Sequence, residues 1–274
     1  MSMEKIINSI IPDAPTPKES YLGEDGLLHC AVCHEKVERF FSVPELNIHR
    51  KVGCICACEK AKIEAENNRA KREECERKRS VCFKESNMWK WTFANDDRKN
   101  PKISDAMQNY VKNFTDFRKD GKGLLLYGTV GTGKTYLAAC IANALIDNEY
   151  SALMTNFTTV INTLQGIYEG KQEYMNSLNR YDLLILDDLG VERETPFVLE
   201  QVYNIIDARY RSGLPFIVTT NLTAEELKKP QSVEYSRIYD RILERCHPVK
   251  VEGISRRREN LKDGFADTQR LLGL

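Results

Sequence analysis

The chain has 274 residues, of which 42% are hydrophobic, so it is long enough to bury a full core and its composition is neither disordered nor fibrous. Its 40 basic and 40 acidic side chains cancel, which excludes a global field that would attract nucleic acid or an anionic membrane. The sequence contains no secretory signal and no apolar run of about 20 residues, so we expect a cytoplasmic protein without a membrane partner.

Composition divides the chain into four parts. Residues 1–28 contain three prolines among polar residues, which predicts a flexible tail. Five of the nine cysteines follow, and they predict a zinc-binding module over residues 29–60. Alternating acidic and basic residues without glycine or proline predict a charged helical linker over residues 61–85. The remaining residues, 86–274, form the largest predicted domain.

The cysteines of the module are arranged as Cys30-x2-Cys33 and Cys54-x-Cys56-x-Cys58. A two-residue spacing lets a turn bring both sulfurs onto one tetrahedral ion. A segment this short has too small a hydrophobic core to fold without a stabilising cross-link such as a bound metal. Free cytosolic thiols are the alternative. Because structural zinc takes four ligands, the spacing alone leaves the ligand set open. Other possible donors are His29, His34 and His49.

From about residue 86 onward, short apolar runs alternate with helix-length amphipathic segments, a rhythm that predicts βαβ units and therefore an α/β fold with a parallel sheet. The expected strands are Gly123–Tyr127, Ala152–Thr155, Leu183–Asp187 and Phe216–Thr219, with Val249–Val251 as a weaker fifth.

A glycine-rich loop follows the first of these strands and precedes a helical stretch, the context that a phosphate-binding P-loop requires. Its backbone N–H groups and the positive end of the helix would hold the phosphates of ATP, with Lys134 on the β- and γ-phosphates and Thr135 on Mg²⁺. The predicted ATP-binding residues are Gly128, Thr129, Val130, Gly131, Thr132, Gly133, Lys134 and Thr135.

Two further strands also end in polar residues. Leu183–Asp187 delivers Asp187 and then Asp188, so we expect Asp187 to bind ATP-associated Mg²⁺ and Asp188 to act as the general base. Asp188 is one methylene shorter than the glutamate common in such enzymes, which suggests slow, partner-regulated hydrolysis. Asn221 follows the strand at Phe216–Thr219 and is placed to orient the water or the γ-phosphate.

In order and spacing, these motifs resemble the AAA+ helicase-loader family typified by DnaC and DnaI. The resemblance covers about residues 90 to 260 and implies an AAA+ three-layer sandwich with a five-stranded parallel sheet behind a small zinc-binding N-terminal domain. The motifs are the glycine loop, Asp-Asp-Leu-Gly190, Thr-Thr-Asn221, Arg-x3-Arg241 and Ser-Arg-Arg257.

The resemblance also implies roles for arginines. Arg241 corresponds to the finger that acts on ATP held by a neighbouring subunit, with Arg237 as a second candidate, so ATP should promote a ring or spiral of subunits. Arg257 corresponds to the arginine that senses the γ-phosphate in the same subunit, although its neighbours Arg256 and Arg258 could also do so. A guanidinium suits both roles because it is always charged and can donate two parallel hydrogen bonds to phosphate oxygens.

The family pattern favours Cys30, Cys33, Cys56 and Cys58 as the zinc ligands, with Cys54 as the alternate. It implies an ATPase that grips the replicative DNA helicase through the N-terminal domain and delivers it to single-stranded DNA, with hydrolysis driving release. Two alternatives stay open: an IstB-like transposition helper that binds double-stranded DNA, and a zinc-dependent adaptor that binds nucleotide without hydrolysing it.

Three aromatic residues at the start of the large domain allow two interpretations. Trp89, Trp91 and Phe93 could stack nucleic-acid bases. Their position favours packing against the domain, near the adenine.

Overall fold

In the computed structural model, the described residues are 19–46, 48–84, 86–190, 195–256 and 269–273. The chain divides into two compact units, residues 1–74 and 75–274. Within the described ranges, no helix is both long enough and apolar enough to cross a membrane.

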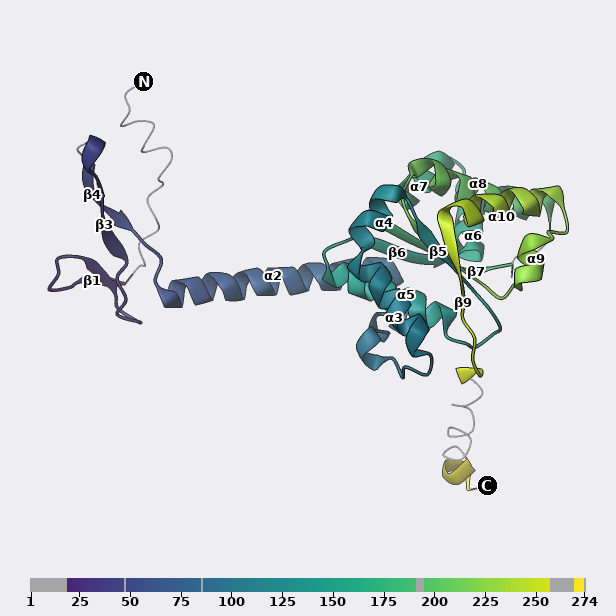
Figure 1. Ribbon diagram of the computed structural model, residues 1–274, viewed down its shortest axis with the longest axis horizontal. Coiled ribbons are helices and arrows are strands. Elements are labelled where there is room, and N and C mark those ends of the chain that lie inside the picture. Colours follow the sequence, from purple (N-terminus) through teal and green to yellow (C-terminus); the bar gives the residue numbers. More distant parts are fainter. Residues whose placement is uncertain (1–18, 47, 85, 191–194, 257–268, 274) are drawn as a thin grey trace. The chain divides into compact units, whose positions relative to one another are not determined.

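The first unit contains two antiparallel hairpins (Figure 1). Because β1 pairs with β2, ordered structure begins before residue 28, where the sequence had predicted a flexible tail. The apolar core of this unit is small and consists of Cys30, Val37 and Cys56, with a few partly buried neighbours. Its elements are β1 (Ser20–Leu22), β2 (Leu28–Cys30), β3 (Glu38–Val43), the 3-10 helix η1 (Pro44–Leu46) and β4 (Ile48–Gly53).

A helix of 27 residues, α2 (Ala57–Phe83), begins four residues before the predicted charged linker and covers it as far as Phe83. Most of its side chains are exposed, as expected for a sequence of alternating charges without an apolar face. Its last turns differ from that prediction, because Cys75, Cys82 and Phe83 are buried in the core of the second unit. The second unit therefore begins about ten residues before the predicted boundary at residue 86.

The second unit is built on a parallel sheet of five strands in the order β6-β7-β8-β5-β9 (Figure 1). The predicted α/β fold is confirmed. The fifth strand begins three residues before the predicted start at Val249 and ends one residue before the predicted end, because Cys246 is buried and already pairs with Gly123. The strands are β5 (Gly123–Tyr127), β6 (Ala152–Asn156), β7 (Leu183–Leu189), β8 (Phe216–Thr220) and β9 (Cys246–Lys250).

Helices cover both faces of the sheet, which gives three layers. Along β5, Leu124 and Leu126 belong to one apolar cluster, whereas Leu125 belongs to the other, as the alternation of a strand requires. The first cluster includes residues of α3 (Pro101–Lys112), α4 (Phe114–Asp120) and α5 (Lys134–Asp147). The second includes residues of α6 (Phe157–Gly166), α7 (Lys171–Leu178), α8 (Pro196–Ser212), α9 (Ala224–Lys228) and α10 (Val233–Arg245).

One buried cation ties α8 to the sheet. Arg209 is 0% exposed, and its guanidinium donates to the carbonyl oxygens of Tyr181, Asp182 and Pro215 at 2.7 to 3.2 Å. Burial lowers the pKa of Arg209 to about 10, so the side chain is still protonated at neutral pH. These bonds fix the end of α8 against the start of β7 and the loop before β8.

Arg209→Met should lower the free energy of unfolding by about 3 kcal/mol, because three carbonyl oxygens lose their donor in a site that water does not reach. Urea titration followed by tryptophan fluorescence measures this loss. Arg211→Met is the matched control: the Arg211 side chain is 73% exposed, and its loss should cost at most about 1 kcal/mol. If both variants lost the same free energy of unfolding, the stabilising role of the buried Arg209 hydrogen bonds would be contradicted.

Candidate functional site

The glycine-rich loop lies between the end of β5 and the first turn of α5, as predicted. Gly131 and Gly133 have φ of 84° and 99°, in the left-handed region where only glycine is unstrained. The loop can therefore curl around a phosphate group, and the N-terminus of α5 adds its positive end.

Lys134 connects this loop to another strand. Its side chain is 5% exposed, and Nζ donates to Gly128 O, Thr129 O and Asn221 Oδ1, each at 2.8 Å. Asn221 directly follows β8, so the structure brings it to the phosphate loop as the sequence predicted. A buried ammonium needs such acceptors, and phosphate oxygens could take their place.

Asp187 lies at the end of the buried part of β7 and is 9% exposed. Its Oδ1 accepts hydrogen bonds from Thr135 Oγ1 at 3.1 Å and from Thr219 Oγ1 at 2.6 Å. Burial raises the pKa of Asp187, and the charge of Asp188 adds to that effect, while the hydroxyl groups of Thr219 and Thr135 and the charge of Lys134 oppose it. Thr135 and Asp187, the predicted Mg²⁺ ligands, are thus in direct contact.

Asp188 differs sharply from its neighbour. The register between β7 and β8 shifts after Leu186, Asp188 has φ of 57°, and its side chain is exposed while that of Asp187 is buried. Its backbone N–H donates to Thr219 Oγ1 at 2.9 Å, which holds the bulge in place. Such a bulge re-aims a side chain, and here it gives two adjacent carboxylates different environments.

These groups line one cavity of about 690 Å³. It runs from the polar end at Lys134 and Asp187 to an aromatic end, where the rings of Trp91 and Tyr136 lie 5.8 Å apart. Trp91 packs against the domain as the sequence favoured. The lining residues are Met88, Trp91, Asn95, Asp97, Val130, Gly131, Gly133, Lys134, Thr135, Tyr136, Asn156, Asp187, Asp188, Asn221 and Arg256.

The sequence did not single out several of these residues. Thr219 is not a lining residue but donates a hydrogen bond to the lining residue Asp187, and its place two residues before Asn221 in the motif Thr-Thr-Asn221 is the signal that could have identified it. Asn156 pairs in register with Asp187 at the end of β6. Asp97 lies in an irregular segment, and neither periodicity nor a motif marks it.

Of the predicted arginines that the structure describes, Arg256 lines this cavity, whereas Arg237 and Arg241 do not. Arg241 lies on α10, where it forms an ion pair with Asp207 at 2.8 Å and donates to the hydroxyl of Tyr203 at 2.8 Å. Arg237, one turn earlier, is exposed beside a separate hollow of about 540 Å³ between α8 and α10. Arg257 lies outside the described residues.

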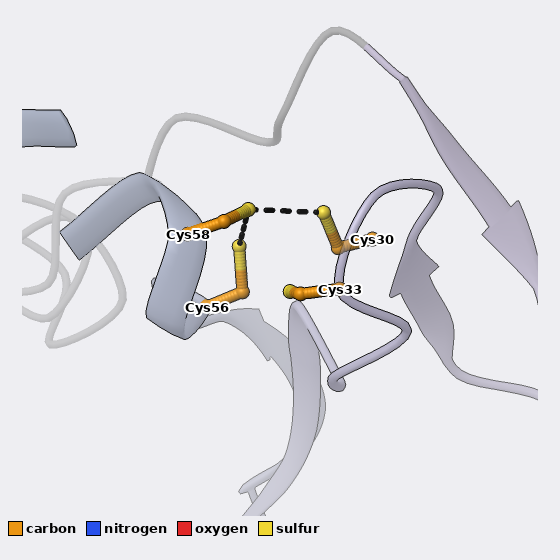
Figure 2. Close-up of side chains that lie close together, drawn as sticks. All are labelled: Cys30, Cys33, Cys56 and Cys58. Carbon is orange, nitrogen blue, oxygen red and sulfur yellow. Dashed lines mark hydrogen bonds between the residues drawn. The ribbon is translucent and has the colours of Figure 1, made fainter. Parts of the chain in front are cut away.

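Four cysteines of the first unit gather around one point (Figure 2). The sulfurs of Cys30, Cys33, Cys56 and Cys58 all lie within 4.8 Å of one another, with 3.4 Å between Cys30 and Cys58 and 3.2 Å between Cys56 and Cys58. Tetrahedral coordination at a Zn–S distance of about 2.3 Å places sulfurs about 3.8 Å apart, within the range of these contacts.

The alternate ligand, Cys54, is not in the cluster; its Sγ donates to Lys36 O. The three histidines are engaged elsewhere: His29 contacts Asp25, His34 contacts Tyr21, and His49 contacts Ser42.

The backbone favours a thiolate at Cys30. N–H groups of Cys33 and Val32 point at its sulfur and lower the pKa of the Cys30 thiol to about 6; the bond from Val32 N is 3.4 Å long. The turn that makes this possible places His34 at φ of 60°, with its N–H donating to Cys30 O. Donors aimed at sulfur suit a metal-bound thiolate.

Taken together, the strand–loop–helix at β5, the carboxylate at the end of β7 and the asparagine after β8 define a P-loop ATP-binding protein with the AAA+ fold. The sequence profile of one family, described as IstB-like ATP binding protein, matches residues 62–263. The chain belongs to this family.

Curated proteins similar to this chain include two named replicative helicase loaders. The chain is 30% identical over 161 residues to the replicative helicase loader DnaI of Bacillus subtilis, covering 54% of this chain and 51% of that one. It is 30% identical over 133 residues to the replicative helicase loader DnaC of Escherichia coli, covering 46% and 52%. A crystal structure of DnaI superposes with a TM-score of 0.54 at 26% identity, covering 66% of this chain and 99% of the other. The chain thus spans about half the length of the curated relatives it matches.

Lys134→Ala should weaken ATP binding by about 10- to 100-fold, the factor that corresponds to the loss of a charge-assisted hydrogen bond. Isothermal titration calorimetry measures the affinity. Lys122→Ala serves as the control, because Lys122 precedes β5 and its Nζ donates to Glu244 O, away from the cavity. An unchanged affinity in Lys134→Ala would rule out the assignment of the loop.

Proposed function

We propose that the chain is an ATPase that loads a replicative helicase onto single-stranded DNA. The observation that carries the ATPase part is the convergence of Lys134, Asp187, Asp188 and Asn221 on one cavity from three strand ends. Membership of an ATP-binding family and the similarity to two proteins named replicative helicase loaders support the rest.

The donor set fits ATP and Mg²⁺. The loop from Gly128 to Thr135 and Lys134 would hold the phosphates, and Thr135 with Asp187 would hold the cation, which would favour the charged form of a carboxylate whose pKa burial otherwise raises. Bound Mg²⁺ would neutralise charge on the β- and γ-phosphates. Asp188 is exposed to the cavity and is our candidate to accept a proton from water, and Asn221 is our candidate to orient that water.

Arg241 would act on ATP held by a second copy of the chain. Its position on α10, outside the cavity of its own subunit, supports a role in trans over one in cis. A guanidinium supplied by a neighbour makes turnover depend on assembly, so an isolated subunit should hydrolyse ATP slowly. Arg257, which follows the described residue Arg256, is our candidate for sensing the γ-phosphate.

The first unit would be a zinc module that contacts the helicase. Four converging sulfurs, a backbone that favours a thiolate at Cys30, and a small apolar core that itself includes Cys30 and Cys56 all support a structural Zn²⁺. With so little apolar core, the fold of this unit would depend on the metal.

Cys56→Ser should remove bound zinc and unfold the first unit, because three thiolates cannot complete a closed tetrahedral site. Metal content by mass spectrometry should fall from about one zinc per chain to near zero. Cys54→Ser is the matched control, since Cys54 lies outside the cluster, and it should retain the metal. Zinc retained by Cys56→Ser would refute the site.

The family description favours a second candidate. The chain matches the IstB-like ATP binding protein family, and the second candidate is the transposition helper that the sequence left open. A transposition helper would bind double-stranded DNA stably and would have no affinity for helicase.

The decisive experiment is co-purification of the chain with the replicative helicase of its own organism, with and without ATP. We expect a stoichiometric complex with the full chain and none with residues 75–274 alone. The ATPase rate should rise with protein concentration and with helicase and single-stranded DNA, and Arg241→Ala should abolish that rise while ATP still binds. Stable binding to double-stranded DNA without helicase would favour the second candidate.

A further inference from the structure

The segment that follows β9 lies directly on the phosphate loop. A Cβ atom on Gly128 would stand 2.4 Å from Val251 O, and one on Gly131 would stand 2.2 Å from Ser255 Oγ. The backbone N–H of Arg256 donates to Gly131 O at 3.0 Å. The loop glycines therefore leave room for this segment as well as for phosphate, and the segment is bonded to the loop that would hold the nucleotide.

The side chain of Arg256 then crosses to a different part of the chain. Its Nη1 lies 3.1 Å from the place where a Cβ on Gly133 would stand, and its Nη2 donates to Asp97 Oδ1 at 2.8 Å. The guanidinium also lies 5.8 Å from the centre of the Tyr136 ring, within the range of a cation–π contact. A single side chain thus contacts the phosphate loop, the first turn of α5 and the segment before α3.

A second carboxylate strengthens the hold on Arg256. The side chain of Asp96 is 1% exposed, and its Oδ2 accepts a hydrogen bond from the hydroxyl of Ser104. Its Oδ1 has no hydrogen-bond partner and lies 4.0 Å from Arg256 Nη2. A buried carboxylate oxygen without a donor favours a nearby cation, so Asp96 and Asp97 together hold the guanidinium on this side of the cavity.

The pair of Arg256 and Asp97 lies at the rim of the cavity. Both residues line it, and their side chains remain 26% and 40% exposed. Arg256 also lines a smaller hollow of about 240 Å³ beside the N-terminus of α3. The pair therefore joins the segment after β9 to the segment before α3 at a solvent-accessible edge of the cavity.

We propose that Asp97 and Arg256 are residues of the nucleotide site and form a clasp that limits how fast adenine nucleotides enter and leave. The ion pair of the clasp must break before a nucleotide can enter or leave. It forms again whether the cavity is empty or holds a nucleotide. Removing it therefore raises the association and dissociation rates together and changes the affinity little. This proposal requires nucleotide binding, but neither hydrolysis nor a helicase partner.

The test is stopped-flow fluorescence of the full chain with N-methylanthraniloyl-ADP. Asp97→Asn should raise both rates by about fivefold, the factor expected when a partly exposed ion pair is lost, and should change Kd by less than about twofold. Asp105→Asn is the matched control, because it removes the neighbouring ion pair with Arg98, 2.7 Å long and on the surface. Both rates should stay at the wild-type values in that variant.

A charge exchange gives an independent check. Asp97→Arg and Arg256→Asp should each speed exchange, and the double variant should return both rates toward those of the wild type. Rates in Asp97→Asn that match the wild type, equal effects in the control, or a double variant as fast as the single ones would each overturn the clasp. Loss of hydrolysis or of helicase binding would leave these rates measurable, so the two proposals fail separately.

Discussion

The buried ammonium group of Lys134 sets the strictest condition in the ATPase unit. A cation with 5% exposure must be surrounded by acceptors, and they come from two loop carbonyls and from Asn221. Asn221 reaches it because β8 lies next to β5 in the sheet, and Asp187 reaches Thr135 because β7 lies next to β8. The strand order of the sheet is thus what assembles the site.

The two units are stabilised in different ways. The sheet unit buries apolar residues on both faces and hydrogen-bonds most of its buried polar groups, as the Nε and Nη2 atoms of Arg209 do. Among the described residues of the first unit, the buried apolar side chains are Leu27, Val37 and two of the four converging cysteines, Cys30 and Cys56. Its order rests on hairpin pairing and on the sulfur cluster, so its stability should follow metal supply and redox state, whereas that of the sheet unit should not.

Sequence patterns could predict the parts of the site that depend on the period of an element or on a fixed motif. Strands β5 to β8, the phosphate loop, Asp187 and Asn221 are of this kind, whereas the choice of four among the five clustered cysteines depended on the family resemblance. The ends of strands were harder to predict. Strand β9 begins at Cys246, where it pairs with Gly123, and no local sequence pattern encodes such a tertiary contact. The bond from Thr219 to Asp187 and the pair of Asp97 with Arg256 join residues 32 and 159 positions apart. Such contacts follow only from the folded arrangement.

Helix α5 connects the site to the long helix α2. Its first turn carries Lys134 and Thr135, while near its other end Asn143 accepts a hydrogen bond from Arg79 Nε at 3.1 Å and Asp147 forms an ion pair with the same arginine. An α-helix of 14 residues is about 21 Å long and bends little over that distance. The two contacts of Arg79 therefore hold the C-terminal turns of α2 to the far end of the helix that carries Lys134 and Thr135, so neither helix can slide along the other without breaking them.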